Sequence, residues 1–178
     1  KDILFMQGDP ANHLYIVRYG RIKLYEAAGD GRQQIVRLLE AGDFFGELSL
    51  FNDTLHTLNA EALEDTGICF LPKAEFLNLI RQHPDMSLRI MQTMSRRLAY
   101  AERFIGDLSL KSIEERIASW LLVRADNTGI RTPHGIEIST NLSRQELANL
   151  LGATQETLSR RLTRMRDDGA IATRGQKT

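Results

Sequence analysis

The sequence has few of the residues that stabilise small secreted proteins or cross membranes. Its 178 residues include one cysteine, Cys69, so an internal disulfide framework is excluded. No apolar run approaches the roughly 20 residues that a membrane-spanning helix needs. Formal net charge is also absent, since 23 basic residues balance 23 acidic ones. We therefore expect a cytoplasmic protein in a reducing compartment, with no membrane partner.

Charge is unevenly distributed along the chain, although it sums to zero. Residues 1–108 hold 12 basic and 15 acidic side chains, whereas residues 109–178 hold 11 and 8. A modest basic excess in the last part of the chain suits contact with phosphates. The length allows one large or two small domains.

The first third of the chain consists of short strand-like segments separated by glycine-containing turns. Strands are expected at 3–6, 14–17, 22–25, 34–39, 58–62 and 67–71. Short strands at this spacing predict an antiparallel roll or barrel. Pro72 ends the pattern, and residues 73–82 are expected to form a short helix.

A long helix is expected from Met86 to about Leu108. Apolar residues recur along it at alternating spacings of three and four, as in a heptad seam. The seam consists of Met91, Met94, Leu98, Ala101, Ile105 and Leu108. One interpretation is a helix that packs along its own domain; the other, which we favour, is a parallel homodimer in which this seam meets an identical helix.

After a break at 109–112, the pattern predicts a winged helix. We expect a helix over 113–124 with Ile117, Trp120, Leu121 and Leu122 facing inward. A polar loop over 126–135, a strand at 136–138, two short helices and a strand at 169–173 follow. The sequence ends before a second wing strand could return, so we expect that its far end is cut short.

The two short helices carry their own start and stop signals. Ser143 and Glu146 fit a capping box, and Gly152 suits a tight turn between helices. Thr154 can cap the second helix, whose apolar residues Leu158 and Leu162 would face the core. These features predict a helix-turn-helix.

The opposite face of the second helix is polar. Glu156, Ser159 and Arg160 stand at i, i+3 and i+4, so they project together. A carboxylate can accept from cytosine N4, and an arginine can bind guanine O6 and N7, which predicts major-groove recognition of double-stranded DNA. The alternative is an ordinary helical hairpin with charges in water. The predicted DNA-binding residues are Thr154, Gln155, Glu156, Ser159, Arg160, Arg161 and Arg164, with Arg161 and Arg164 reaching phosphate or solvent.

Three motifs in this layout resemble the cAMP receptor protein/fumarate–nitrate regulator (CRP/FNR) superfamily of bacterial transcription regulators. They are FGELSL at 45–50, EERIA at 114–118 and QETLSR at 155–160. The resemblance covers essentially the whole chain. It implies an α+β fold with a cyclic-nucleotide-binding-like jelly roll at 1–84, a dimerisation helix at 85–108 and a winged helix-turn-helix at 109–178. It also implies a homodimer on DNA, with RNA polymerase as a further partner.

The recognition helix is similar to that of the fumarate–nitrate branch. Glu156, Ser159 and Arg160 match its Glu-x-x-Ser-Arg pattern, while Gln155 replaces the arginine of the cAMP-receptor branch. The resemblance implies a palindrome with TTGAT-like half-sites. The alternatives are an enzyme that uses a nucleotide pocket and an effector-binding module that contacts proteins. The sequence has no glycine-rich phosphate loop or nucleophile–base signature, so we expect no enzymatic activity.

The resemblance also implies an effector pocket in the roll. Its residues would be Gly46, Glu47, Leu48, Thr57, Leu58 and Ala101. Thr57 replaces the family's phosphate-binding arginine, and a phosphate without a cation would lose its charge-assisted hydrogen bonds. We therefore expect a structural role for Glu47 rather than cAMP binding, and an effector or redox signal that the sequence does not identify.

Cys69 has two interpretations. Between Ile68 and Phe70 it suits a small core residue. Its position also aligns with an iron–sulfur ligand of the oxygen-sensing members, whose other cysteines lie in an N-terminal segment absent from this sequence. One thiolate cannot hold such a cluster, so no metal site is expected in this chain, and a cluster or haem would require the full-length protein. The four histidines are scattered and are expected at the surface: His13, His56, His83 and His134.

Overall fold

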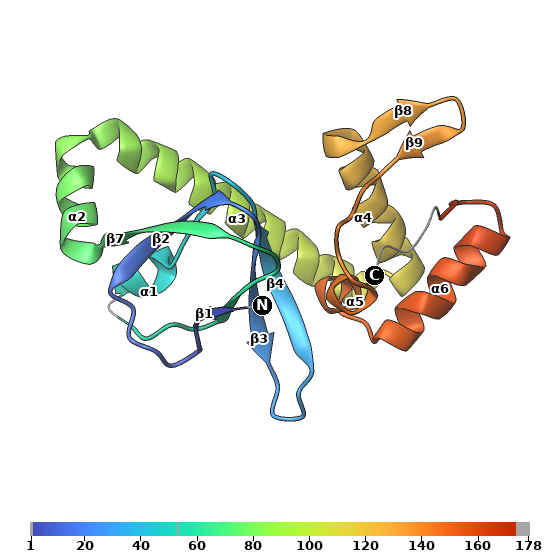
Figure 1. The fold of residues 1–178 in the computed structure, drawn as a ribbon, viewed down its shortest axis with the longest axis horizontal. Coiled ribbons are helices and arrows are strands. Elements are labelled where there is room, and N and C mark those ends of the chain that lie inside the picture. The colour runs from blue at the N-terminus through green and yellow to red at the C-terminus, as the bar shows by residue number, and fades with distance from the viewer. Residues whose placement is uncertain (1, 53, 174–178) are drawn as a thin grey trace. The chain divides into compact units, whose positions relative to one another are not determined.

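The computed structural model describes residues 2–52 and 54–173 (Figure 1). Its internal contacts form two compact units, Lys1–Leu98 and Ala99–Thr178. The division falls inside a single 27-residue helix, α3 (Pro84–Leu110). The predicted division into a roll, a separate dimerisation helix and a winged helix stays a prediction.

The first unit is built on two antiparallel sheets, as predicted. A four-stranded sheet has the order β1-β6-β3-β4, and a three-stranded sheet has the order β5-β2-β7. The strands are β1 (Ile3–Phe5), β2 (His13–Tyr19), β3 (Ile22–Ala27), β4 (Gln33–Leu39), β5 (Phe44–Phe45), β6 (Asn59–Ala62) and β7 (Gly67–Pro72). The short strands and their turns confirm the β-roll.

Apolar side chains from both sheets fill the interior of the roll. Val17, Ile22 and Phe45 are at most 1% exposed and belong to one core cluster. A second cluster joins the roll to three helices: α1 (Glu47–Asn52), α2 (Lys73–Gln82) and the start of α3. Its buried residues are Leu14, Leu50 and Phe76, with Met86 and Ile90 packed against them. Burial of this apolar area provides the main stabilisation of the unit.

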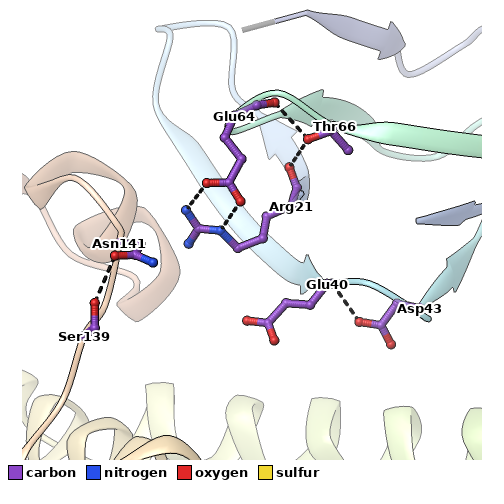
Figure 2. Close-up of polar contacts among 7 residues, drawn as sticks. All are labelled: Arg21, Glu40, Asp43, Glu64, Thr66, Ser139 and Asn141. Atoms are coloured by element: carbon purple, nitrogen blue, oxygen red, sulfur yellow. Dashed lines mark hydrogen bonds and ion pairs between the residues drawn. The ribbon is translucent and has the colours of Figure 1, made fainter. Parts of the chain in front are cut away.

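Polar contacts fix the turn between β2 and β3. Arg21 donates two hydrogen bonds to Glu64, each 2.9 Å long (Figure 2). The Thr66 hydroxyl donates to the Glu64 carbonyl, and in the separate turn between β4 and β5 the Asp43 carboxylate accepts from the Glu40 amide. Gly20 completes the turn with a φ of +78°, and a Cβ there would lie 2.4 Å from Thr66 Oγ1. A larger residue would therefore be strained as well as crowded.

The second unit begins with the last part of α3, and its described residues form three further helices and a hairpin. These are α4 (Ile113–Thr128), β8 (Ile130–Thr132), β9 (Gly135–Glu137), α5 (Arg144–Leu151) and α6 (Gln155–Asp167). Its core cluster contains Ile117, Leu147, Ala148, Leu158 and Leu162. Ser139 donates a hydrogen bond to Asn141 in the segment before α5 (Figure 2).

Two sequence predictions for this unit are wrong. Residues 126–135 are not a loop, because α4 continues to Thr128 and β8 pairs with β9. Leu122 does not face inward, since it is 67% exposed. The polar composition of this segment gave no strand pattern. Short strands at the surface can form when they have a pairing partner, even without an apolar face to bury.

The predicted strand at 169–173 is not formed either. Gly169, with a φ of +77°, follows the end of α6, and residues 171–173 have no regular structure. A strand needs a neighbour for its backbone hydrogen bonds, and the described residues offer none here. A returning wing strand would lie outside the described residues. Among the described residues, no helix is both long enough and apolar enough to cross a membrane.

Candidate functional site

The helix-turn-helix in the second unit is fixed by the caps that its sequence predicts. Ser143 Oγ accepts from the Glu146 amide at 3.2 Å, and the Glu146 carboxylate accepts from the Ser143 amide at 2.8 Å. Gly152 ends α5 in the left-handed region, with a φ of 65°. Thr154 Oγ1 then accepts from the Thr157 amide at 3.2 Å and starts α6. These contacts confirm the predicted capping box, turn glycine and second cap.

Core packing determines which face of α6 points outward. Leu158 is fully buried and Leu162 is 7% exposed, so this side of α6 lies against α4 and α5. Ala148 of α5 is also fully buried, which allows the two helices to approach closely. The residues on the other side of α6 are thereby held at the surface on a rigid support.

That outer face carries the predicted base-reading group. Glu156 and Arg160 are exposed, and Ser159 lies half-buried between them. Arg160 Nη1 lies 3.5 Å from Glu156 Oε1, with both side chains more than two-thirds exposed. An exposed ion pair of this kind contributes little to stability. Breaking it so that both side chains can bind a ligand therefore costs little free energy. Gln155 and Arg164 are exposed on the same helix.

Arg161 forms an ion pair that the sequence did not indicate. Its Nη1 lies 2.7 Å from Glu114 Oε1 of α4, so its guanidinium is turned toward the body of the unit. Only packing of α6 on α4 brings these two residues together, so no local pattern could have indicated the pair. Arg164 Nε lies 3.8 Å from Asp168 Oδ2, and its side chain is exposed.

Glu47 in the roll occupies a buried position at the start of α1. Gly46 precedes it with a φ of +88°, and a Cβ there would lie 2.9 Å from the His13 carbonyl oxygen. The Glu47 side chain is 1% exposed. Its Oε1 accepts from Arg37 Nη1 at 3.1 Å and from Arg97 Nη1 at 3.0 Å. The carboxylate is therefore neutralised inside the protein.

Arg97 makes two further contacts with the roll. Its Nη2 donates to the Phe44 carbonyl oxygen at 2.6 Å, and its guanidinium lies 4.4 Å from the centre of the Phe44 ring. Burial lowers the pKa of Arg97, and the nearby Arg37 adds to this effect, while the carboxylate of Glu47 opposes it. The sequence pattern indicated a pocket without a cation and did not reveal either arginine. They come from a distant strand and a distant helix, and the only local signal was that Arg37 stands two residues from both Ile35 and Leu39 of β4, on the face that these buried residues occupy.

The other predicted pocket residues lie in different surroundings. Leu48 is 48% exposed, and Leu58 packs against the core of the roll. Thr57 lines a different cavity, of about 720 Å³, together with His56 and Lys73. Ala101 is an exposed residue of the second unit. The predicted six-residue pocket stays a prediction, of which the structure describes Gly46 and Glu47 side by side at the start of α1.

Cys69 and one histidine also differ from expectation. Cys69 is exposed on β7, opposite Ile16 of β2, so its predicted core position is wrong. His56 was expected at the surface but is 4% exposed and stacks on Phe5 with ring centres 3.6 Å apart. Burial lowers the pKa of His56. No cluster of three or more His, Cys, Asp or Glu side chains that could hold a metal occurs among the described residues.

The predicted seam on α3 is largely uncovered. Met91, Leu98 and Ile105 are each at least 60% exposed, and Leu108 is 38% exposed. Met94 is half-buried, and none of the described residues of α3 is fully buried. A stripe of large apolar side chains on a long helix is typical of a surface that meets a partner.

Comparisons with known proteins agree with this architecture. A family model for the cyclic nucleotide-binding domain matches residues 1–83, and one for the Crp-like helix-turn-helix domain matches residues 115–178. The transcriptional activator protein Anr of Pseudomonas protegens is 31% identical over 176 residues, which cover 99% of this chain and 72% of the relative. The chain belongs to the CRP/FNR family of transcription regulators.

Other members of the CRP/FNR family share both sequence and fold with it. The global nitrogen regulator of Synechocystis is 31% identical over 171 residues, covering 95% of this chain and 76% of the relative. The solved structure of a CooA mutant from Carboxydothermus hydrogenoformans superposes with a TM-score of 0.87 at 29% identity, covering 99% of this chain and 77% of that one. The two sequence relatives are named as a transcriptional activator and a global nitrogen regulator, and the helix-turn-helix model matches this chain, so this CRP/FNR member is a transcription regulator with a DNA-binding helix-turn-helix.

Proposed function

We propose that this CRP/FNR regulator binds, as a homodimer, a DNA palindrome with TTGAT-like half-sites. The observation that carries the proposal is the exposed face of α6, where Glu156, Ser159 and Arg160 stand together above the buried Leu158. Arg160 would donate two hydrogen bonds to a guanine, and Glu156 would accept from a cytosine amine. Ser159 would contact a neighbouring thymine. Each good contact of this kind contributes about 1–3 kcal/mol of base discrimination.

The exposed seam of α3 supports the dimer. Met91, Leu98 and Ile105 recur at heptad positions and are largely uncovered. Pairing two such helices would bury these side chains and place two recognition helices on one duplex, as a palindrome requires. Ala101, Met94 and Leu108 would complete the interface.

Regulation would follow from a signal in the roll. An effector or a redox event there would shift the packing along α3 and change the spacing of the two recognition helices. RNA polymerase would be the second macromolecular partner. One structural neighbour, CLP of Xanthomonas campestris, is a c-di-GMP responsive global regulator and superposes with a TM-score of 0.85 at 25% identity, which supports control by an effector in a chain of this fold.

The decisive experiment measures binding of Arg160→Ala to a TTGAT palindrome and to a scrambled duplex of equal length. We expect the unmutated protein to prefer the palindrome. The variant should lose at least about fivefold in that preference, in line with the 1–3 kcal/mol of a bidentate arginine contact, and retain salt-dependent non-specific binding.

Arg166→Ala serves as the matched control. Arg166 lies on the same helix, is 51% exposed and pairs with its neighbour Asp167, away from the base-reading group. It should leave the preference intact. Equal affinity of the unmutated protein for both duplexes would contradict the proposal, and absence of any salt-dependent DNA binding would favour a module that contacts proteins.

A further inference from the structure

The buried cluster Arg37–Glu47–Arg97 connects three elements of the first unit. Arg37 comes from β4, Glu47 from α1 and Arg97 from α3. Both guanidiniums approach the same carboxylate oxygen, Oε1, within 3.1 Å. With its bond to Phe44 and its stacking on that ring, Arg97 fixes α3 to the roll at this point.

The charges of the cluster make Glu47 its essential member. Two cations share one anion, and the three side chains are 16%, 1% and 18% exposed in the order Arg37, Glu47, Arg97. Without the carboxylate, two guanidiniums would face each other with little access to water. Asp43 is a second acidic group that acts on Arg97, but among the described residues it is Glu47 that accepts hydrogen bonds from both arginines.

The second oxygen of Glu47 is shielded as well. Oε2 is buried and has no hydrogen-bond partner. The negative charge of the carboxylate is therefore balanced by the two arginines that bind Oε1. The roll therefore holds its buried glutamate with its own side chains. An incoming hydroxyl or phosphate would first have to displace one of them.

We propose that this cluster is an internal lock, which holds α3 against the roll in the DNA-binding arrangement without a small ligand at Glu47. Arg97 is then a positioning residue for DNA binding, although it is remote from α6 in the chain. This inference rests on the proposed function, since DNA affinity is its readout. It predicts that cyclic nucleotides do not change the affinity of the unmutated protein.

The test compares DNA affinity of the full chain on the TTGAT palindrome across four variants. Arg97→Gln and Glu47→Gln should each weaken specific binding at least tenfold. Arg97→Lys, which keeps the charge but loses the stacking and the planar donors, should recover part of that loss. Arg37→Gln leaves a neutral Glu47–Arg97 pair and should lose less than about threefold.

Arg96→Gln is the matched control, because Arg96 is exposed and bonds Thr93 on its own helix rather than the roll. It should bind DNA as the unmutated protein does. Adding 1 mM cAMP or cGMP, the probes used, should leave the unmutated affinity within about twofold. Unchanged affinity in Arg97→Gln, or a tenfold gain on adding either nucleotide, would overturn the lock.

A second readout separates failure of the lock from failure of the proposed function. Hydrogen exchange of the α3 amides around Arg97 should accelerate at least tenfold in Arg97→Gln, but not in Arg96→Gln. If the unmutated protein shows no preference for the palindrome, the DNA proposal fails. The lock is then tested by hydrogen exchange of the α3 amides alone. If Arg97→Gln does not fold, Arg97→Lys must show the accelerated exchange, and unchanged exchange in it would refute the lock.

Discussion

Glu47→Gln should destabilise the first unit far more than its nearly unchanged volume suggests. Removing one partner from a buried ion pair costs about 3–5 kcal/mol, because the remaining charge stays buried without compensation. Glutamine keeps one acceptor oxygen for Arg37 or Arg97, so we expect the lower end, about 3 kcal/mol. Arg37→Gln leaves one carboxylate facing one guanidinium, and its cost should be about 1 kcal/mol or less.

Urea unfolding followed by circular dichroism measures this difference. With a slope of about 2 kcal/mol per molar urea, a loss of 3 kcal/mol lowers the midpoint by about 1.5 M. Trp120 is the single tryptophan and lies in the second unit, so its fluorescence reports on the part of the protein without Glu47. Its transition should move less than the transition of the roll.

Glu64→Gln is the control for the loss of a surface carboxylate. Glu64 also pairs with an arginine, Arg21, but its side chain is 43% exposed, so its loss should cost less than about 1 kcal/mol. If Glu47→Gln and Arg37→Gln shifted the midpoint equally, or if Glu47→Gln behaved like Glu64→Gln, the charge argument for the cluster would be wrong.

Two further predictions concern the turn of the helix-turn-helix and the buried histidine. Gly152→Ala should cost about 1–2 kcal/mol, because a β-carbon is unfavourable at a φ of 65°, and the Trp120 transition should report it; Gly152→Asn should lose less. Burial lowers the folded-state pKa of His56 below its ordinary 6.5, partly opposed by Asp9, so the unfolded chain binds a proton more readily. The stabilisation is therefore complete above about pH 6.5 and is lost as the pH falls toward the lower folded-state pKa. His56→Phe should flatten urea midpoints between pH 7.5 and 5, and an identical slope in both proteins would contradict this assignment.

Local sequence determined the features that depend on neighbours in the chain. Ser143, Gly152 and Thr154 define the helix-turn-helix through contacts within a few residues, so cap and turn patterns were sufficient. The helix at 73–82 and the strands of the roll follow from short-range periodicity in the same way. The polar face at Glu156 and Arg160 was visible because helical spacing alone places those residues together.

Tertiary structure decided the features that depend on packing between distant segments. No local sequence pattern indicates that Arg161 pairs with Glu114, or that Arg37 and Arg97 both bind Glu47. A charged residue in a sequence does not show which residue of opposite charge it will meet in the fold. The β8–β9 hairpin and the exposure of Cys69 on β7 depend on which strands pair and which face is covered. Hydrogen bonds and side-chain periodicity within an element are fixed by the chain itself, whereas burial and ion pairing are properties of the assembled core.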